Sequence, residues 1–470
     1  MITRDAALLE CGLTPGILSG AVREFFGAQS PRRERLKRYY DGEHAISGRA
    51  RAKGAANNRI AADYPRYIVT MASGYMAGSP IGYQDEAQER QLSALLAAYD
   101  RVNIEAVDAE ITVNQSLYGV GLEALFMDEA ARPTSAAVDP RYGFVVYDDT
   151  VRHAPLFGVM WRARHGADGA REGYAADAYT SWEVIGYAGQ TLESLAETGR
   201  AAHPFGAVPL IEYWNNADER GDFEPVMGLI DAYDTLQSDR VNDKEQFADS
   251  LLVFTGVGGL DWGDPQDKRG VGERLRMEKA VALPDKDARV EWLTNSLNET
   301  DTQVLADSIR ADIHKMSLVP DLTDQNFSGN TSGVAMRYKL LGLEQLTKIK
   351  ERWFREGLRQ RLRQYAAALG ALGGAALDAE RVRISFTRSL PVNDLEIAQT
   401  VRTLQGIVPD ALLLAQVPFI QDARAALETL RAQREEAARQ QSALFNQYAD
   451  ANGPNRFDGQ TDGKTDIEAG

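Results

Sequence analysis

The chain has 470 residues, 44% of them hydrophobic, and its 52 Lys and Arg against 68 Asp and Glu give a net charge of −16. This length predicts two to four lobes, and the acidity argues against a protein that wraps duplex DNA by neutralising its phosphates. The single cysteine, Cys11, excludes an internal disulfide framework, and the lack of an 18-residue apolar run or a signal-peptide pattern favours a soluble, intracellular chain.

The first 223 residues predict a mixed α/β lobe. Residues 1–45 have a helical, charged pattern, in which the basic residues of 32–38 are expected to form a solvated helix face. Apolar residues three and four apart predict a helix over Asn57–Tyr83, packed on most sides, and a further helix over 88–118. Short apolar segments separated by Gly, Asp and Pro predict strands and turns over 119–215.

The segment Glu224–Asp249 has an unusual polarity for a helix. Its first half carries an apolar stripe, but Gln237–Gln246 is polar at every position except Val241. A helix that is polar all round cannot attach to a core through one stripe. We therefore expect this part to stand in solvent or to lie between neighbouring subunits of an oligomer.

A small β insertion follows, and then a second helix. Leu251–Phe254 and Ala280–Leu283 predict short strands around a polar, Gly-rich excursion. A capping-box pattern, Thr300-x-x-Gln303, predicts the start of a helix that carries Leu305, Ile309, Ile313 and Met316 on one face and ends before Pro320. Two helices that bracket a β insertion predict a hairpin-like stalk with a β tip.

The rest of the chain alternates between loops and helices. Asp321–Gly333 has the composition of a loop, and the next helix, predicted over Val334–Leu369, would be on the order of 50 Å long. A strand is predicted over Arg381–Phe386, and helices from Asn393 onward. The tail after Tyr448 has little to bury and is predicted to be disordered.

Motifs for catalysis or cofactor binding are weak in this sequence. The run Gly459-Gln-Thr-Asp-Gly463-Lys464-Thr465 has three residues between its glycines, where a phosphate-binding loop needs four, and no cofactor is predicted. Asp321 and Asp324 could hold a divalent cation as an acidic pair. A metal-dependent DNA-processing nuclease that uses these two residues is therefore kept as an alternative.

Three stretches together resemble the portal proteins of tailed bacteriophages, in the branch found in siphophages of Gram-positive hosts. The first is Tyr39-Tyr-Asp-Gly-Glu-His44 with Asn57-Asn-Arg-Ile60 and Tyr64-Pro-Arg-Tyr-Ile68 through Gly74-Tyr75 and Gly78. The second is Ile211-Glu-Tyr-Trp-Asn-Asn216 through Gly221-Asp-Phe-Glu224 and Leu229-Ile-Asp-Ala-Tyr233 to Ser238-Asp-Arg-Val-Asn-Asp-Lys-Glu245. The third is Ser332-Gly-Val-Ala-Met336, Tyr338-Lys-Leu340 and Gly342-Leu-Glu-Gln345. Their order covers roughly residues 35–390, which makes the resemblance specific.

The resemblance implies an α+β, mainly helical portal fold that assembles as a ring of twelve subunits, with no enzymatic activity and no cofactor. The implied parts are a wing (1–223), stem helix 1 (224–250), a clip (251–298), stem helix 2 (299–318), a tunnel loop (319–333), a long helix with a wing strand (334–390), a crown (391–448) and a disordered tail (449–470).

The resemblance also implies positions for the functional residues and identities for the partners. Stem residues Arg240, Asp243, Lys244 and Glu245 would bridge adjacent subunits, and the DNA channel would be lined by Lys315, Asp321, Asp324, Gln325, Asn326 and Asn330. Double-stranded DNA would pass through the ring during packaging and ejection. The implied protein partners are further copies of the chain in a homododecamer, the terminase large subunit, the head-tail adaptor, and the major capsid and scaffolding proteins. The chain would reside at the portal vertex of the virion capsid and, during assembly, in the host cytoplasm, without contact to a membrane.

Overall fold

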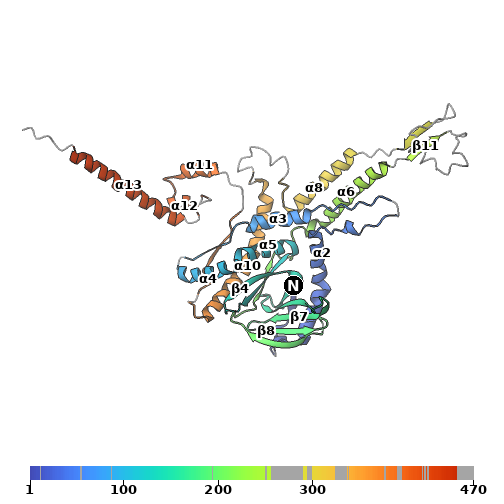
Figure 1. The fold of residues 1–470 in the computed structure, drawn as a ribbon, viewed down its shortest axis with the longest axis horizontal. Coiled ribbons are helices and arrows are strands. Elements are labelled where there is room, and N and C mark those ends of the chain that lie inside the picture. Colours follow the sequence, from blue (N-terminus) through green and yellow to red (C-terminus); the bar gives the residue numbers. More distant parts are fainter. Residues whose placement is uncertain are drawn as a thin grey trace, which may run out of the picture. The chain divides into compact units, whose positions relative to one another are not determined.

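The computed structural model of the chain is shown in Figure 1. It describes residues 1–451 apart from 11, 53–54, 86, 193, 249–250, 256–288, 294–298, 323–335, 337, 375–376, 389–393, 415–416, 418–419 and 421–422. The chain divides into a large unit, Met1–Thr331 with Ala335–Ser389, and a small unit, Ser332–Val334 with Leu390–Gly470. The α+β class is confirmed, although helices make up about half of the chain and do not dominate it.

The large unit contains a six-stranded sheet that is covered on one face by helices. Its strand order is β1-β5-β6-β7-β8-β9, in which β1 pairs with β5 in parallel and every other pair is antiparallel. The strands are β1 (Ile2–Arg4), β5 (Gly143–Asp148), β6 (Pro155–His165), β7 (Arg171–Tyr179), β8 (Glu183–Gly189) and β9 (Ala196–Ala202). Helix α1 (Pro15–Glu24) and the π-helical turn η2 (Phe25–Gln29) bury Leu18, Val22 and Phe25 against this sheet.

A second sheet lies between the first sheet and a layer of helices. It has the order β10-β3-β4, with β3 (Val120–Met127), β4 (Pro133–Val138) and β10 (Leu210–Trp214). Leu122 and Leu210 pack against Val145 and Tyr147 of the six-stranded sheet. On the other side, α4 (Glu89–Val102), α5 (Ile104–Tyr118) and α10 (Leu341–Ala371) build the largest apolar core. The strands predicted over 119–215 are thereby confirmed.

The long helix α10 crosses the second sheet closely and carries buried charges. A Cβ at Gly357 would lie 2.5 Å from the ring of Tyr213, so only glycine lets the helix approach β10 this closely. One turn further on, the guanidinium of Arg361 is fully buried beside the carboxylates of Glu123 and Asp108. Burial raises the pKa of Asp108 to about 6, although the charge of Arg361 opposes that effect. The core of the large unit is thus held by a charged cluster as well as by apolar packing.

Several predicted boundaries differ from the observed ones. The helix expected over Asn57–Tyr83 is only α3, Tyr64–Ala77, because the residues before it form neither helix nor strand. The helix expected over 88–118 is split into α4 and α5 by Asn103, whose φ is +52°. Asparagine tolerates this left-handed conformation better than most residues do, so it can separate two helices without a glycine. The strand expected near 381–386 is confirmed as β13 (Arg383–Ser385), which pairs with β2 (Gly82–Gln84).

The small unit consists of helices. They are α11 (Asp394–Leu404), α12 (Asp410–Leu414) and α13 (Ala423–Ala451). Between 431 and 442 every residue of α13 is exposed, and the sequence there is rich in Arg, Glu and Gln. The helices predicted from residue 393 onward are therefore confirmed, whereas the predicted tail lies almost entirely outside the described residues.

Candidate functional site

Helices α6 (Met227–Ala248) and α8 (Glu299–Ser317) lie side by side (Figure 1). The chain between them contains β11 (Leu251–Thr255) and β12 (Arg289–Leu293), which form an antiparallel pair. The predicted order of helix, β insertion and helix is thus observed. The second strand was predicted over 280–283, which lies outside the described residues, and the observed partner of β11 is β12.

Charged side chains connect α6 to the first turn of α8. Arg240 donates to Glu299, and the ammonium of Lys244 lies 3.5 Å from the same carboxylate. The hydrogen bond from Arg240 lowers the pKa of Glu299. Asp243 and Glu245 have no ion-pair partner in the part of the chain that the structure describes. Of the four predicted interface residues, two are therefore engaged within the chain and two are open.

The start of α8 differs from the prediction. The helix begins at Glu299, so Thr300 lies inside its first turn, and Gln303 donates to Asp307 on the same helix instead of closing a capping box. The helix itself is confirmed, and its predicted apolar face is only partly covered within the chain. Ile313 is fully buried, but Leu305 and Met316 are 51% and 58% exposed, and Val304 beside Leu305 is exposed too. Apolar side chains are therefore left on the surface of α8.

A polar stripe on α6 is covered by another segment of the same chain. Asp234, Ser238 and Asn242 are four residues apart, so they share one face of the helix, and all three are fully buried. They accept hydrogen bonds from the backbone N–H groups of Ala62 (2.8 Å), Ile60 (2.9 Å) and Asn58 (2.6 Å), respectively. The expectation that this stretch meets only solvent or neighbouring subunits is therefore wrong for this face.

The covering segment is residues 44–62, which we call the clasp loop and which is described except for 53 and 54. Its residues 58–62 run antiparallel to α6, and alternate residues meet successive helical turns. Two residues of an extended chain and four residues of a helix both advance by ~6 Å. The hydrogen bonds can therefore recur at every second residue of the loop and every fourth residue of α6. Arg49 and Arg51 add two ion pairs, both to Asp239 of α6. The polar side chains of α6 thus bind the backbone of the clasp loop by hydrogen bonds.

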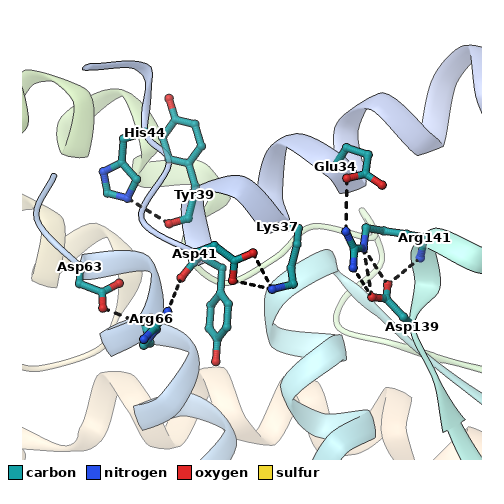
Figure 2. Close-up of polar contacts among 10 residues, drawn as sticks. Glu34, Lys37, Tyr39, Asp41, His44, Asp63, Arg66, Asp139 and Arg141 are labelled. Atoms are coloured by element: carbon teal, nitrogen blue, oxygen red, sulfur yellow. Dashed lines mark hydrogen bonds and ion pairs between the residues drawn. The ribbon is translucent and has the colours of Figure 1, made fainter. Parts of the chain in front are cut away.

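The clasp loop starts where α2 (Ser30–Tyr40) ends. Figure 2 shows this end of α2, where Lys37 pairs with Asp41 and His44 contacts the backbone carbonyl oxygen of Tyr39. The basic cluster of α2 was predicted to be a solvated face, and this is wrong for Arg33. Its side chain is buried and donates to the carbonyl oxygens of Pro140 and Gly143.

The end of α8 leads into the predicted loop. Lys315 is exposed in the last turn, and Leu318 follows in a left-handed conformation with φ of +60°. The hydroxyl of Tyr67 on α3 donates to the carbonyl oxygen of Pro320 at 2.8 Å and accepts from the N–H of Leu322 at 3.1 Å. Asp321 lies 3.9 Å from His314. Asp324, Gln325, Asn326 and Asn330 lie outside the described residues.

Tyr67 and the polar stripe of α6 are the residues that sequence reasoning missed. Tyr67 has the spacing of a core aromatic, and nothing in its neighbourhood along the chain points to residue 320. The stripe had a signal, because three short polar side chains recur every fourth residue at 234, 238 and 242. That repeat is typical of a buried polar face. It does not stand out in this sequence, because the residues on the other faces of the helix are polar too.

Within the part of the chain that the structure describes, no group of three His, Cys, Asp or Glu side chains is arranged to hold a metal ion. None of the helices built from these residues is both long and apolar enough to cross a bilayer.

Known proteins resemble this chain over most of its length. The family described as "Phage portal protein, SPP1 Gp6-like" matches residues 26–440. The portal protein of Bacillus phage SPP1 is 24% identical over 415 residues, which cover 84% of this chain and 78% of that protein. The portal protein of Clostridium phage phiCD119 is 23% identical over 251 residues, which cover 53% of each chain.

Proposed function

Because the chain belongs to the SPP1 Gp6-like family of phage portal proteins, we propose that it forms a closed ring at one capsid vertex through which double-stranded DNA enters and leaves. Proteins of this family are structural and not enzymatic, so the nuclease alternative based on Asp321 and Asp324 is dropped. The energy for moving DNA must then come from a partner.

The proposal assigns a role to each segment in chain order. Residues 1–223 form the wing; α6 and α8 form the stem; 251–298 form the clip; 319–333 form the tunnel loop; 334–390 form the long helix and a wing strand; and 391–448 form the crown. The observation that carries this assignment is the pair of adjacent helices α6 and α8 with the strand pair β11 and β12 inserted between them. The hairpin is anchored to its own subunit through buried residues such as Ile230 and Ile313, and its inserted strand pair suits a stalk with a tip in an assembly.

The proposed subunit contacts use the open surface of α6 and α8. Val304, Leu305 and Met316 place apolar area on the surface, which is typical of a protein–protein interface. On α6, Arg240, Asp243, Lys244 and Glu245 would offer both signs of charge to the next subunit. In a cyclic ring each interface joins two different surfaces, so opposite charges can face each other across it.

The proposed channel lining combines few cations with polar groups. Lys315 would face the DNA backbone, while Asp321, Asp324, Gln325, Asn326 and Asn330 would border the bore. A net charge of −16 suits a conduit that passes a polyanion without holding it, because tight phosphate binding would slow the DNA. The clip would dock the terminase large subunit and later the head-tail adaptor, and the outer surface would meet the major capsid and scaffolding proteins.

Negative-stain microscopy and native mass spectrometry of the purified chain test the proposal. Rings with a central hole, of about twelve subunits, are the expected result. A compact monomer or dimer at micromolar concentration would contradict it. Deleting residues 322–331 should leave the rings intact and impair DNA packaging, whereas loss of the rings would mean that this segment is a subunit contact.

A further inference from the structure

One carboxylate of α6 holds both ends of the clasp loop. The Oδ2 atom of Asp234 lies 2.6 Å from Nδ1 of His44, where the loop begins. Its Oδ1 atom accepts a hydrogen bond from the N–H of Ala62, where the loop ends, at 2.8 Å. Both side chains of the His44–Asp234 pair are fully buried. The loop is therefore closed on a single residue of α6, with Ser238 and Asn242 as further contacts along the helix.

Both ring nitrogens of His44 face acceptors. Nε2 lies 3.0 Å from the carbonyl oxygen of Tyr39, and Nδ1 faces the Asp234 carboxylate. A carbonyl oxygen and a carboxylate oxygen can only accept, so each nitrogen must carry a proton, and the ring fits this site as an imidazolium. The ring also stacks on that of Tyr39, with centroids 4.9 Å apart and planes 14° apart.

The charges around His44 favour its protonated form. Burial lowers the pKa of His44, but the hydrogen bond and charge of Asp234, the carbonyl of Tyr39 and the charge of Asp231 outweigh burial and raise it above 6.5. On α6, Asp234 faces the ring directly, and Asp231 accepts a hydrogen bond from the Tyr39 hydroxyl. On α2, Arg35 lies over the Tyr39 ring, 6.0 Å from its centroid. The two acids of α6, Asp234 and Asp231, thus favour the charged form of His44.

We propose that the clasp loop is a protonation-dependent lock, which fixes α6 to the α2–α3 part of the chain while His44 is charged and releases α6 when His44 loses its proton. After deprotonation one ring nitrogen would present a lone pair to an acceptor oxygen, inside a site from which water is excluded. The repulsion would be relieved by opening the loop from Asp234. This lock concerns one chain alone and stands whether or not the ring proposed above forms.

Release would change what α6 exposes. Asp234, Ser238 and Asn242 would lose the backbone N–H groups that cover them, and a buried polar stripe would become available to water or to another chain. Because the folded pKa of His44 is raised, the lock is fully formed below pH 6.5 and is lost as the pH rises through that raised value. Between these two limits the opening constant rises by about tenfold per pH unit, since one proton is released on opening.

Hydrogen exchange of the full-length protein tests the lock. The protection factors of the amides of Asn58, Ile60 and Ala62 are measured between pH 6 and 9, after correction for the intrinsic pH dependence of exchange. In the wild type they should fall by up to about tenfold per pH unit once the pH exceeds 6.5. In His44→Gln, which cannot carry the charge, they should be lower at pH 6 and should not change with pH. His165→Gln removes an exposed histidine of β6 and should behave as the wild type.

Two results would overturn the lock. One is a wild-type protection that stays constant from pH 6 to 9, a measurement that needs no variant. The other is a protection that falls with pH equally in wild type and His44→Gln. The ring status of each sample, read by negative stain, separates this outcome from a failure of the proposed function, because monomers and rings both contain the clasp loop.

Discussion

The Nε atom of Arg361 on α10 lies 2.8 and 2.9 Å from the two carboxylate oxygens of Glu123 on β3, and both side chains are fully buried. Glu123 also accepts from the hydroxyl of Tyr213 at 2.5 Å, and Asp108 adds a second acid on the other side of Arg361. The charges of this cluster are thus bound to one another and not to water.

Replacing Arg361 with methionine should strongly destabilise the large unit. The change keeps much of the side-chain volume but leaves two carboxylates buried without their cation, which typically costs about 3–5 kcal/mol. Urea denaturation followed by tryptophan fluorescence measures the loss. The matched control is Arg363→Met, at another arginine of α10. It removes an exposed ion pair between Arg363 and Glu380 and should cost ~0–1 kcal/mol. Equal losses of stability in the two variants would show that the buried cluster contributes no more to the free energy of unfolding than an exposed ion pair.

Because of Asp108, the free energy of unfolding should decrease as the pH rises from about 4 to 7. Its pKa is raised to about 6 by burial, so its contribution is fully present below its unfolded value of 3.8 and is lost as the pH rises through 6. The loss should be about 2–3 kcal/mol. Asp108→Asn cannot ionise and should lack this component, which unfolding by urea at pH 4 and pH 7 would measure. An identical pH dependence of wild type and variant would contradict the assignment.

Asn242→Ala should weaken the clasp loop. The substitution leaves the N–H of Asn58 without its acceptor, and a buried unsatisfied donor costs about 1–3 kcal/mol. Hydrogen exchange should show faster opening of residues 58–62, and urea denaturation should show the loss of stability. Val241→Ala, the adjacent position on the exposed side of α6, should change stability by less than about 0.5 kcal/mol. Unchanged exchange at Asn58 in Asn242→Ala would refute the assigned contact.

Tyr67→Phe should loosen the start of the segment that follows α8. Burial raises the pKa of Tyr67, so its hydroxyl stays protonated and holds both Pro320 and Leu322. Phenylalanine keeps the ring and loses both hydrogen bonds, worth ~1 kcal/mol each. Exchange of the Leu322 amide should rise by about tenfold, while Tyr338→Phe, at a tyrosine that is 73% exposed, should leave it unchanged. No rise in Tyr67→Phe would mean that another group holds this amide.

Asp243→Lys combined with Glu245→Lys should prevent or weaken ring formation without unfolding the chain. Both acids are open on α6, so reversing them alters a proposed subunit contact and no contact within the described part of the subunit. Native mass spectrometry reports the oligomer and circular dichroism reports the fold. Glu129→Lys with Glu172→Lys makes the same change of net charge at exposed positions of β-sheet turns and strands and should leave the rings intact. Normal rings in both double variants would remove Asp243 and Glu245 from the interface.

Periodicity predicted most of the regular elements, because their residues report their own environment. On α10, an apolar stripe at helical spacing includes Leu343, Leu358, Leu362 and Tyr365, and all four are buried. Ile349 has the same spacing in the sequence but is 46% exposed. The stripe therefore gave the helix but not the limits of its packing, which depend on where β10 and α3 meet it.

The parts that could not be predicted are held by residues distant in sequence. Residues 57–63 fall within the helix predicted over Asn57–Tyr83, yet they are not helical, and the N–H groups of Asn58, Ile60 and Ala62 donate to distant acceptors on α6. Arg33 belongs to the basic run expected to be solvated, but it is buried and donates to the carbonyl oxygens of Pro140 and Gly143, more than 100 positions away. Among the predicted site residues, Lys315, Asp321 and the four charges on α6 are located by the structure, and their roles toward DNA or a neighbouring subunit stay predictions.

The pairing of an extended segment with a helix also limits its own length. Two residues of an extended chain advance by about 6.6 Å, and four residues of a helix advance by about 6.0 Å. Each further contact therefore shifts the loop donor by ~0.6 Å relative to its acceptor on α6. Over three contacts the drift is ~1.2 Å and at a fourth it would be ~1.8 Å, whereas hydrogen-bond lengths vary only over about 2.7–3.2 Å, so each added contact needs a larger bend of the backbone. A longer version of this attachment would therefore need a kink or a bulge to bring the two repeats back into step.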